Sequence, residues 1–111
     1  MLTLKKNYEF QKVFKKGVWY GGDLLSVYIV PNNKNLNYIG IAVSKKISKS
    51  SVKRNRIRRL IKEAYRYIEK NILSGFDIVM VWKTNCPFEK ADYYSIIQDL
   101  QKCFDKAKII N

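Results

Sequence analysis

The residues of this sequence best suited to binding chemistry are cationic, and they are concentrated between residues 45 and 66. Ten of the 22 lysines and arginines lie in this fifth of the chain, and only one acidic residue, Glu63, interrupts them. Arginine presents a planar fork of N–H donors that can make two parallel hydrogen bonds to a phosphate, so the cluster predicts binding of a polyanion. The ten residues are Lys45, Lys46, Lys49, Lys53, Arg54, Arg56, Arg58, Arg59, Lys62 and Arg66.

The spacing of apolar residues predicts that most of this cluster lies on one helix, from Ser51 to about Ile72, with Gly75 as the stop. At about 100° per residue, the cationic side chains occupy a stripe separate from the apolar face. A charged run is most often only a solvated face, but such a face usually mixes acids with bases. The near absence of acids therefore favours anion binding. The predicted apolar face contains Ile57, Leu60, Ile61, Ala64, Ile68 and Ile72, and the cationic stripe contains Asn55, Arg58, Arg59, Lys62 and Arg66.

The composition supports a polyanionic partner and removes several kinds of catalytic site. The chain has 111 residues, a formal net charge of +13 and no histidine. Without histidine, Ser-His-Asp triads, Cys-His pairs and histidine-based nucleases are excluded. So large a positive charge favours nucleic acid as the partner, with an acidic membrane surface as the second choice.

The remaining composition predicts an intracellular location. The longest apolar run, residues 24–30, is far shorter than the roughly 20 residues of a membrane-spanning helix. The N-terminus lacks the hydrophobic stretch of a signal peptide, so the expected location is the cytoplasm. Cys86 and Cys103 show no C-x-x-C spacing and are expected to be free thiols.

Hydrophobic periodicity predicts one α+β sandwich domain over residues 1–111, with helices packed on a single sheet. Strands 24–30 and 38–44 are expected to pair as a hairpin across the turn-rich segment between them. Asn7 is the expected cap and Gly17 the expected stop of the first helix. The helix after strand 38–44 is long enough for a parallel crossover. The predicted helices cover 7–16, 51–72 and 89–106, the strands cover 24–30, 38–44 and 76–82, and a further short strand is considered at 18–20.

Several segments together resemble the protein subunit of bacterial ribonuclease P. Ser44-Lys45-Lys46, followed by KRNRIRRLIKE at 53–63, is similar to the signature of that family. FQKVFKKG at 10–17 is similar to its first helix, IGIAV at 39–43 to the strand before the lysines, and FDIV at 76–79 to its last strand. The R-N-R core alone would be a weak match in so basic a chain, but the upstream lysines and the aromatic helix occur at the right separations.

The resemblance implies a fold with an unusual left-handed βαβ crossover, whereas the general rule favours a right-handed one. It also implies that the protein assists a catalytic RNA in removing the 5′ leader of precursor tRNA. Mg²⁺ would be held mainly by the RNA, no protein side chain would be catalytic, and the protein alone would be monomeric. The resemblance assigns catalytic-RNA binding to Lys45, Lys46, Lys53, Arg54, Asn55, Arg56, Arg58, Arg59 and Lys62, and leader binding to Phe10, Phe14 and Tyr28.

Three other readings of the sequence have to be weighed. A metal-dependent nuclease acting alone would need clustered carboxylates, and the aspartates here are scattered. A structural RNA-binding protein, such as a ribosomal protein, would share the charge and size, whereas a DNA-binding module would need a recognition-helix pair or dimer seam that is not evident.

Phe10 and Phe14, at i and i+4, could also be ordinary core residues. Departures from the family pattern occur at Thr3, Ser26, Ser48, Ser50 and Ser51.

Overall fold

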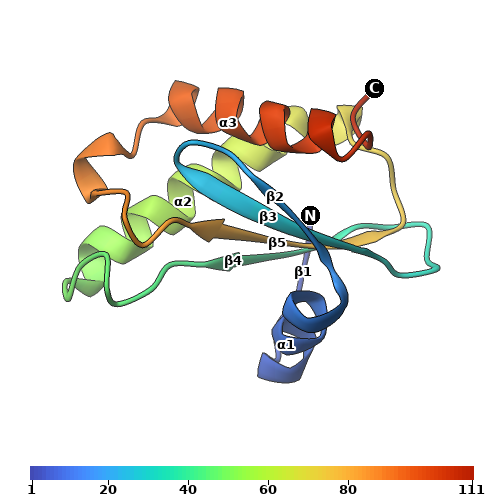
Figure 1. Ribbon diagram of the computed structural model, residues 1–111, viewed down its shortest axis with the longest axis horizontal. Helices are drawn as coiled ribbons and strands as arrows, with labels where there is room; N and C mark the ends of the chain where they lie inside the picture. Colours follow the sequence, from blue (N-terminus) through green and yellow to red (C-terminus); the bar gives the residue numbers. More distant parts are fainter.

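The computed structural model describes residues 1–111 as a five-stranded sheet with helices on both faces (Figure 1). Helices α2 and α3 cover one face, and α1 packs against the other. In chain order the strands are β1 (Leu2–Thr3), β2 (Val18–Gly21), β3 (Leu25–Pro31), β4 (Tyr38–Ala42) and β5 (Phe76–Trp82). The helices are α1 (Asn7–Lys16), α2 (Ser51–Ile68) and α3 (Tyr93–Lys106), and the short 3₁₀ helices are η1 (Glu69–Asn71) and η2 (Phe88–Lys90).

The predicted hairpin between strands 24–30 and 38–44 is wrong. The strand order is β1-β4-β5-β3-β2, so β5 lies between β3 and β4. It runs antiparallel to β3 and parallel to β4, with Ile78 paired to Ile29 on one side and to Ile39 on the other. Because Ile78, Val79 and Met80 are all fully buried, β5 needs cover on both faces and belongs in the middle of the sheet. The true hairpin joins β2 to β3.

The predicted α+β class and the crossover are confirmed. Strands β4 and β5 are adjacent and parallel, and α2 connects them. The hand of this βαβ unit stays a prediction. Its helix starts at Ser51 as expected but ends at Ile68, and η1 continues to Asn71; Gly75 lies in the link to β5 instead of at the helix end.

Other boundaries also differ from prediction. Asn7 is the first residue of α1 and not its cap; the Glu9 carboxylate instead accepts the N–H groups of Lys5 and Lys6, at 3.0 and 2.8 Å. Helix α3 begins at Tyr93, because Asp92 accepts the Ser95 N–H and caps it. The two-residue strand β1 was not predicted, since it is too short to show a periodicity.

Two hydrophobic clusters hold the layers together. The larger lies between the sheet and α2 with α3, and contains Ile57, Ile61, Trp82 and Phe104. The smaller, made of Leu4, Val13 and Val79, lies under α1 on the opposite face. The sheet therefore has two buried faces, and α1 covers its face with far fewer apolar residues than α2 and α3 do.

A buried carboxylate fixes the turn between β2 and β3. Asp99 of α3 is only 4% exposed and accepts the backbone N–H groups of Asp23, Leu24 and Leu25 at 2.7, 3.0 and 3.0 Å. Gly22 allows this approach, because a Cβ there would collide with the carboxylate. The turn thus depends on a residue 74 to 76 positions away in the sequence.

Candidate nucleic-acid interfaces

The exposed cationic side chains of α2 form one surface, called here the arginine face: Lys53, Arg56, Arg59, Lys62 and Arg66. The helix begins at an ordered turn, in which the Ser50 hydroxyl accepts the Lys53 N–H at 3.3 Å and the Ser48 hydroxyl accepts the Ser50 N–H at 3.1 Å. Two of the serines that depart from the family pattern therefore build the start of the helix. The free N–H groups of such a helix end add a partial positive charge.

Arg54 and Arg58 lie near the surface and also make hydrogen bonds within the protein. The Arg54 guanidinium donates to the Ser48 carbonyl at 2.8 Å, while its Nε has no partner. Arg58 donates to the Asn55 side chain at 2.7 Å and to the Val43 carbonyl at 3.5 Å. Both residues are half-buried and connect α2 to the end of β4 and the loop that carries the exposed Lys45 and Lys46.

The predicted leader-binding residues Phe10, Phe14 and Tyr28 form an aromatic cluster on the opposite face of the sheet. The rings of Phe14 and Tyr28 meet edge to face, with centroids 5.0 Å apart and planes at 87°. All three are half-buried and pack on the small cluster of Leu4, Val13 and Val79. The core-packing alternative therefore accounts for part of each ring and leaves the rest accessible.

Gly40 of β4 lets Phe10 lie against the sheet. A Cβ at this position would lie 2.6 Å from Cε2 of the Phe10 ring and 3.2 Å from a methyl of Leu4. Both distances are below normal van der Waals contact, so any larger residue would displace the ring or the strand.

The arginine face and the aromatic cluster meet at one hollow of about 390 Å³, called here the bridging hollow. Strand β1 pairs with β4 only at Tyr38 and Ile39, which leaves the outer edge of β4 open beyond that point. The hollow lies along this edge and brings guanidinium and ammonium groups beside an aromatic ring. Its lining residues are Met1, Thr3, Leu4, Phe10, Ile39, Gly40, Ile41, Arg58, Arg59 and Lys62.

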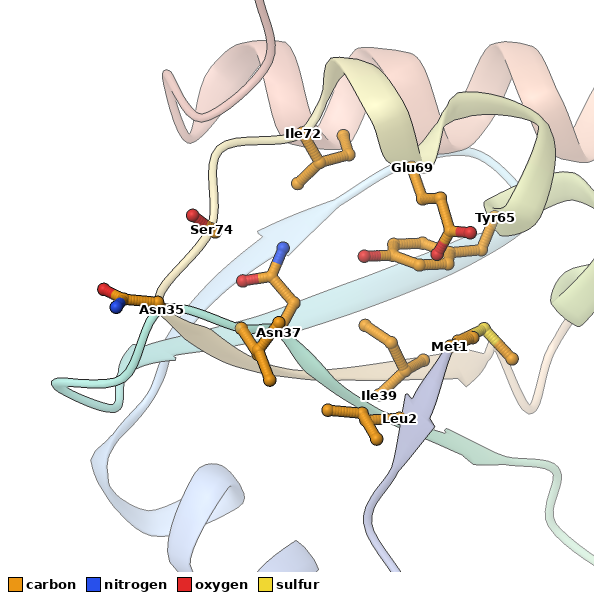
Figure 2. Close-up of a pocket in the computed structure, with 10 residues that line it drawn as sticks. Met1, Leu2, Asn35, Asn37, Ile39, Tyr65, Glu69, Ile72 and Ser74 are labelled. Atoms are coloured by element: carbon orange, nitrogen blue, oxygen red, sulfur yellow. The ribbon is translucent and has the colours of Figure 1, made fainter.

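A separate hollow of about 260 Å³ lies at the other end of α2 and contains none of the predicted site residues (Figure 2). Tyr65 and Glu69 project into it above Ile39, and the Tyr65 hydroxyl points towards Asn37. Burial raises the pKa of the Tyr65 hydroxyl to about 12, so this group stays neutral. Because Glu69 provides the only charged side chain of its lining, the hollow is unsuited to a phosphate.

The structure gathers no cluster of three carboxylate or thiol side chains that could hold a metal ion. Cys86 and Cys103 are free and buried, as predicted for unpaired thiols. Burial raises the pKa of Cys86, and it raises the pKa of Cys103 to about 11, so neither is a reactive thiolate near neutral pH. None of the helices is long and apolar enough to span a bilayer.

One exposed aromatic residue beside the aromatic cluster was not singled out from the sequence. Trp19 of β2 is paired with Tyr28 of β3 and remains 54% exposed. The alternation of side chains along β2 could have placed it, but only once the β2–β3 hairpin was known. The nearby Ser26, a departure from the family pattern, is 6% exposed.

Comparisons with known proteins agree on one family. A family model described as "Ribonuclease P" matches residues 1–108. Among relatives named "Ribonuclease P protein component", the one from Natranaerobius thermophilus is 32% identical over 99% of this chain and 93% of its own length. The one from Alkaliphilus metalliredigens is 42% identical over 97% and 95%. The structure of Staphylococcus aureus RNase P protein has a TM-score of 0.85 and 30% identity, covering 100% of this chain and 99% of that one.

Proposed function

The chain belongs to the ribonuclease P protein family, and we propose that its arginine face binds the catalytic RNA while its aromatic cluster holds the 5′ leader of precursor tRNA. As a ribonuclease P protein component it is one subunit of a tRNA-processing ribonucleoprotein, and its partner is RNA. The proposal concerns which surfaces of this chain meet which part of that RNA.

The observation that carries the proposal is the bridging hollow. Arg58, Arg59 and Lys62 line it from α2, and Phe10 lines it from α1 on the other side of the sheet. A structured RNA bound along α2 would therefore end where a single strand could enter the aromatic cluster. This geometry fits a protein that holds two RNA segments next to each other.

On the arginine face, the interaction is with phosphates. Arg56 and Arg59 are exposed and make no hydrogen bond or ion pair within the protein, so their donors are free for an external anion. Their charges offset the repulsion between two RNAs that approach one another, which lowers the requirement for divalent cations. Binding of this kind is weakened by salt, because it releases counterions from the RNA.

On the aromatic cluster, the interaction is with unpaired bases. Aromatic side chains stack on bases of any sequence, which suits leaders that differ from one precursor to another. The half-buried rings of Phe10, Phe14 and Tyr28 are held by packing, so little freedom is lost when a base stacks on them. A mature tRNA has no leader and would lose this contact, which allows the holoenzyme to prefer the precursor.

The chemical step belongs to the RNA in this proposal. The carboxylates of the protein do not converge as Mg²⁺ ligands, so the ion that activates water for hydrolysis is assigned to the RNA subunit. The residues of this chain bind and orient the substrate.

The test mixes this protein, a bacterial ribonuclease P RNA and 5′-labelled precursor tRNA at low Mg²⁺, beside reactions lacking either the protein or the RNA. Cleavage at the mature 5′ end is expected only with both present. Tight RNA binding without stimulated cleavage would favour a structural RNA-binding protein. Cleavage by the protein alone would overturn the assignment of chemistry to the RNA.

A further inference from the structure

Trp19 extends the aromatic cluster to the edge of the sheet. It lies directly opposite Tyr28 in the antiparallel β2–β3 register. Directly opposed residues point to the same face, with Cβ atoms about 5 Å apart. The next residue, Tyr20, packs into the larger core on the other face, as alternation requires. Trp19 therefore lies on the same face of the sheet as Phe14 and Tyr28.

The indole of Trp19 lies against the backbone of Gly21 on one side and is exposed to solvent on the other. A Cβ on Gly21 would collide with the ring, lying 2.6 Å from its Cζ2 atom. The ring thus leans along its own strand over the glycine, and yet Trp19 remains 54% exposed. A flat aromatic surface that is supported on one side and open on the other is suited to stacking with a nucleic-acid base.

Two lysine ammonium groups bind the turn that begins at Gly21, and one of them, Lys106, reaches it from α3. Lys106 Nζ donates to the Gly21 carbonyl at 2.8 Å, and Lys83 Nζ donates to the Gly22 carbonyl. An ammonium group has three donors, so one bond to a carbonyl leaves donors for a phosphate. The acids at this turn are already engaged, because Asp23 pairs with Lys102 at 3.1 Å and the Asp99 carboxylate accepts three backbone N–H groups.

We infer that Trp19 forms a further nucleotide position for single-stranded RNA, which takes one base on the indole and directs its phosphate towards Lys106 at the Gly21 carbonyl. The inference rests on the proposed function, in which the leader occupies the aromatic cluster. Because it relies on stacking and charge, this position has no marked base preference.

The order of the strands tells which end of the leader reaches Trp19. Phe10 rests against Gly40 of β4, Phe14 meets Tyr28 of β3, and Trp19 lies on β2. In the sheet order β4-β5-β3-β2, this row spans three strand spacings, or about 14 Å. The arginine face borders the β4 side through the bridging hollow. Trp19 is therefore at the end farthest from the catalytic RNA and contacts leader nucleotides distant from the cleavage site.

The experiment measures the affinity of the reconstituted holoenzyme for precursor tRNAs whose leaders are shortened one nucleotide at a time. Trp19→Ala is expected to weaken binding of long leaders about five- to 150-fold, the usual effect of losing one stacked base. The loss disappears once the leader is too short to reach the indole, and Trp19→Phe retains most of the affinity. Tyr94→Ala, which removes an exposed aromatic ring from α3, is the matched control and leaves every leader length unchanged.

Fluorescence provides a second readout on the free protein. Trp82, the other tryptophan, is fully buried and donates to the Cys86 carbonyl at 2.9 Å, so it serves as an internal reference. A single-stranded oligonucleotide with the leader sequence is expected to quench the emission of Trp19, and Trp19→Phe abolishes the change. Unchanged emission on saturation would contradict stacking on the indole.

Phe14→Ala separates the two proposals. If Phe14→Ala shows a dependence on leader length and Trp19→Ala shows none, the additional position is overturned and the leader site remains. If neither shows a dependence, both are overturned. Equal losses at all leader lengths for Trp19→Ala would mean that the indole only supports the fold, which also overturns the inference.

Discussion

The arginine face and the aromatic row differ in how many elements each one needs, where the aromatic row means the aromatic cluster together with Trp19. All cationic residues of the arginine face project from the single helix α2 and are exposed. The aromatic row takes its rings from α1, β2 and β3 and rests on glycines of β2 and β4. A surface of long, flexible cations tolerates small displacements, because Coulomb attraction falls slowly with distance. A surface for stacking does not, because the rings must keep their spacing and orientation.

This difference predicts that changes in the tertiary structure damage the aromatic row first, whereas changes of charge damage the arginine face alone. The following experiments test that separation, from the largest expected effect to the smallest.

The largest effect is expected from Asp99→Ala. The buried carboxylate accepts three N–H groups at the β2–β3 turn, and its loss leaves them without partners. Unsatisfied buried donors cost about 1–3 kcal/mol each, so we expect the free energy of unfolding in urea to fall by about 3–5 kcal/mol. The exposed Asp105 on the same helix is the control, and Asp105→Ala should change stability little. If Asp99→Ala keeps both full stability and full leader affinity, the aromatic row does not depend on the buried Asp99 carboxylate.

Alkaline pH should destabilise the larger core, which contains both Cys103 and Tyr65. The pKa of Cys103 is raised to about 11 and that of Tyr65 to about 12, both by burial. Because the folded protein retains these protons where the unfolded chain releases them, stability is complete below pH 9 and falls as the pH rises towards 11. A loss of about 2–3 kcal/mol is expected in urea titrations over this range. Tyr65→Phe should show a shallower fall above pH 10, and an identical pH profile would contradict this assignment.

Gly40→Ala should affect the aromatic row selectively. The new methyl group would press on the Phe10 ring and Leu4, which we expect to cost about 1–3 kcal/mol of stability. Leader affinity should fall with it, measured as the ratio of precursor to mature tRNA binding. Binding of the catalytic RNA alone, and its dependence on salt, should stay as in the parent protein. Equal losses in both assays would show that the two surfaces are not separable at the bridging hollow.

Arg56→Ala should show the reverse pattern with the smallest effect. The side chain is exposed and has no partner in the protein, so folding stability should change by less than about 0.5 kcal/mol. Affinity for the catalytic RNA should fall severalfold, and the slope of log affinity against log salt should become shallower by about one phosphate contact. Lys108→Asn is the control, because it removes a distant charge and asparagine tolerates the positive φ of 59° at this site. An unchanged slope for Arg56→Ala would remove Arg56 from the interface.

Much of the local structure could be predicted because it depends on neighbouring residues. The apolar run Phe76–Trp82 is a strand with the expected bounds, α1 covers the expected residues, and α2 starts at Ser51. The cationic stripe followed from helical spacing alone. The end of α2 could not be predicted, because Ile72 keeps the helical period of the apolar face. The helix nevertheless ends before it, and the 3₁₀ turn η1 lies between them.

The sequence by itself determined the charge, most of the elements and the cationic side of α2, because each depends on the residues of one segment. The tertiary structure alone decided that β5 separates β3 from β4, that Trp19 lies beside Tyr28, and that Phe10 shares a hollow with Arg58 and Arg59. These are contacts between different elements, and they are selected by which apolar faces can be buried together. A local period reports the face that a residue occupies on its own element, but it carries no information about the neighbour that this face will meet.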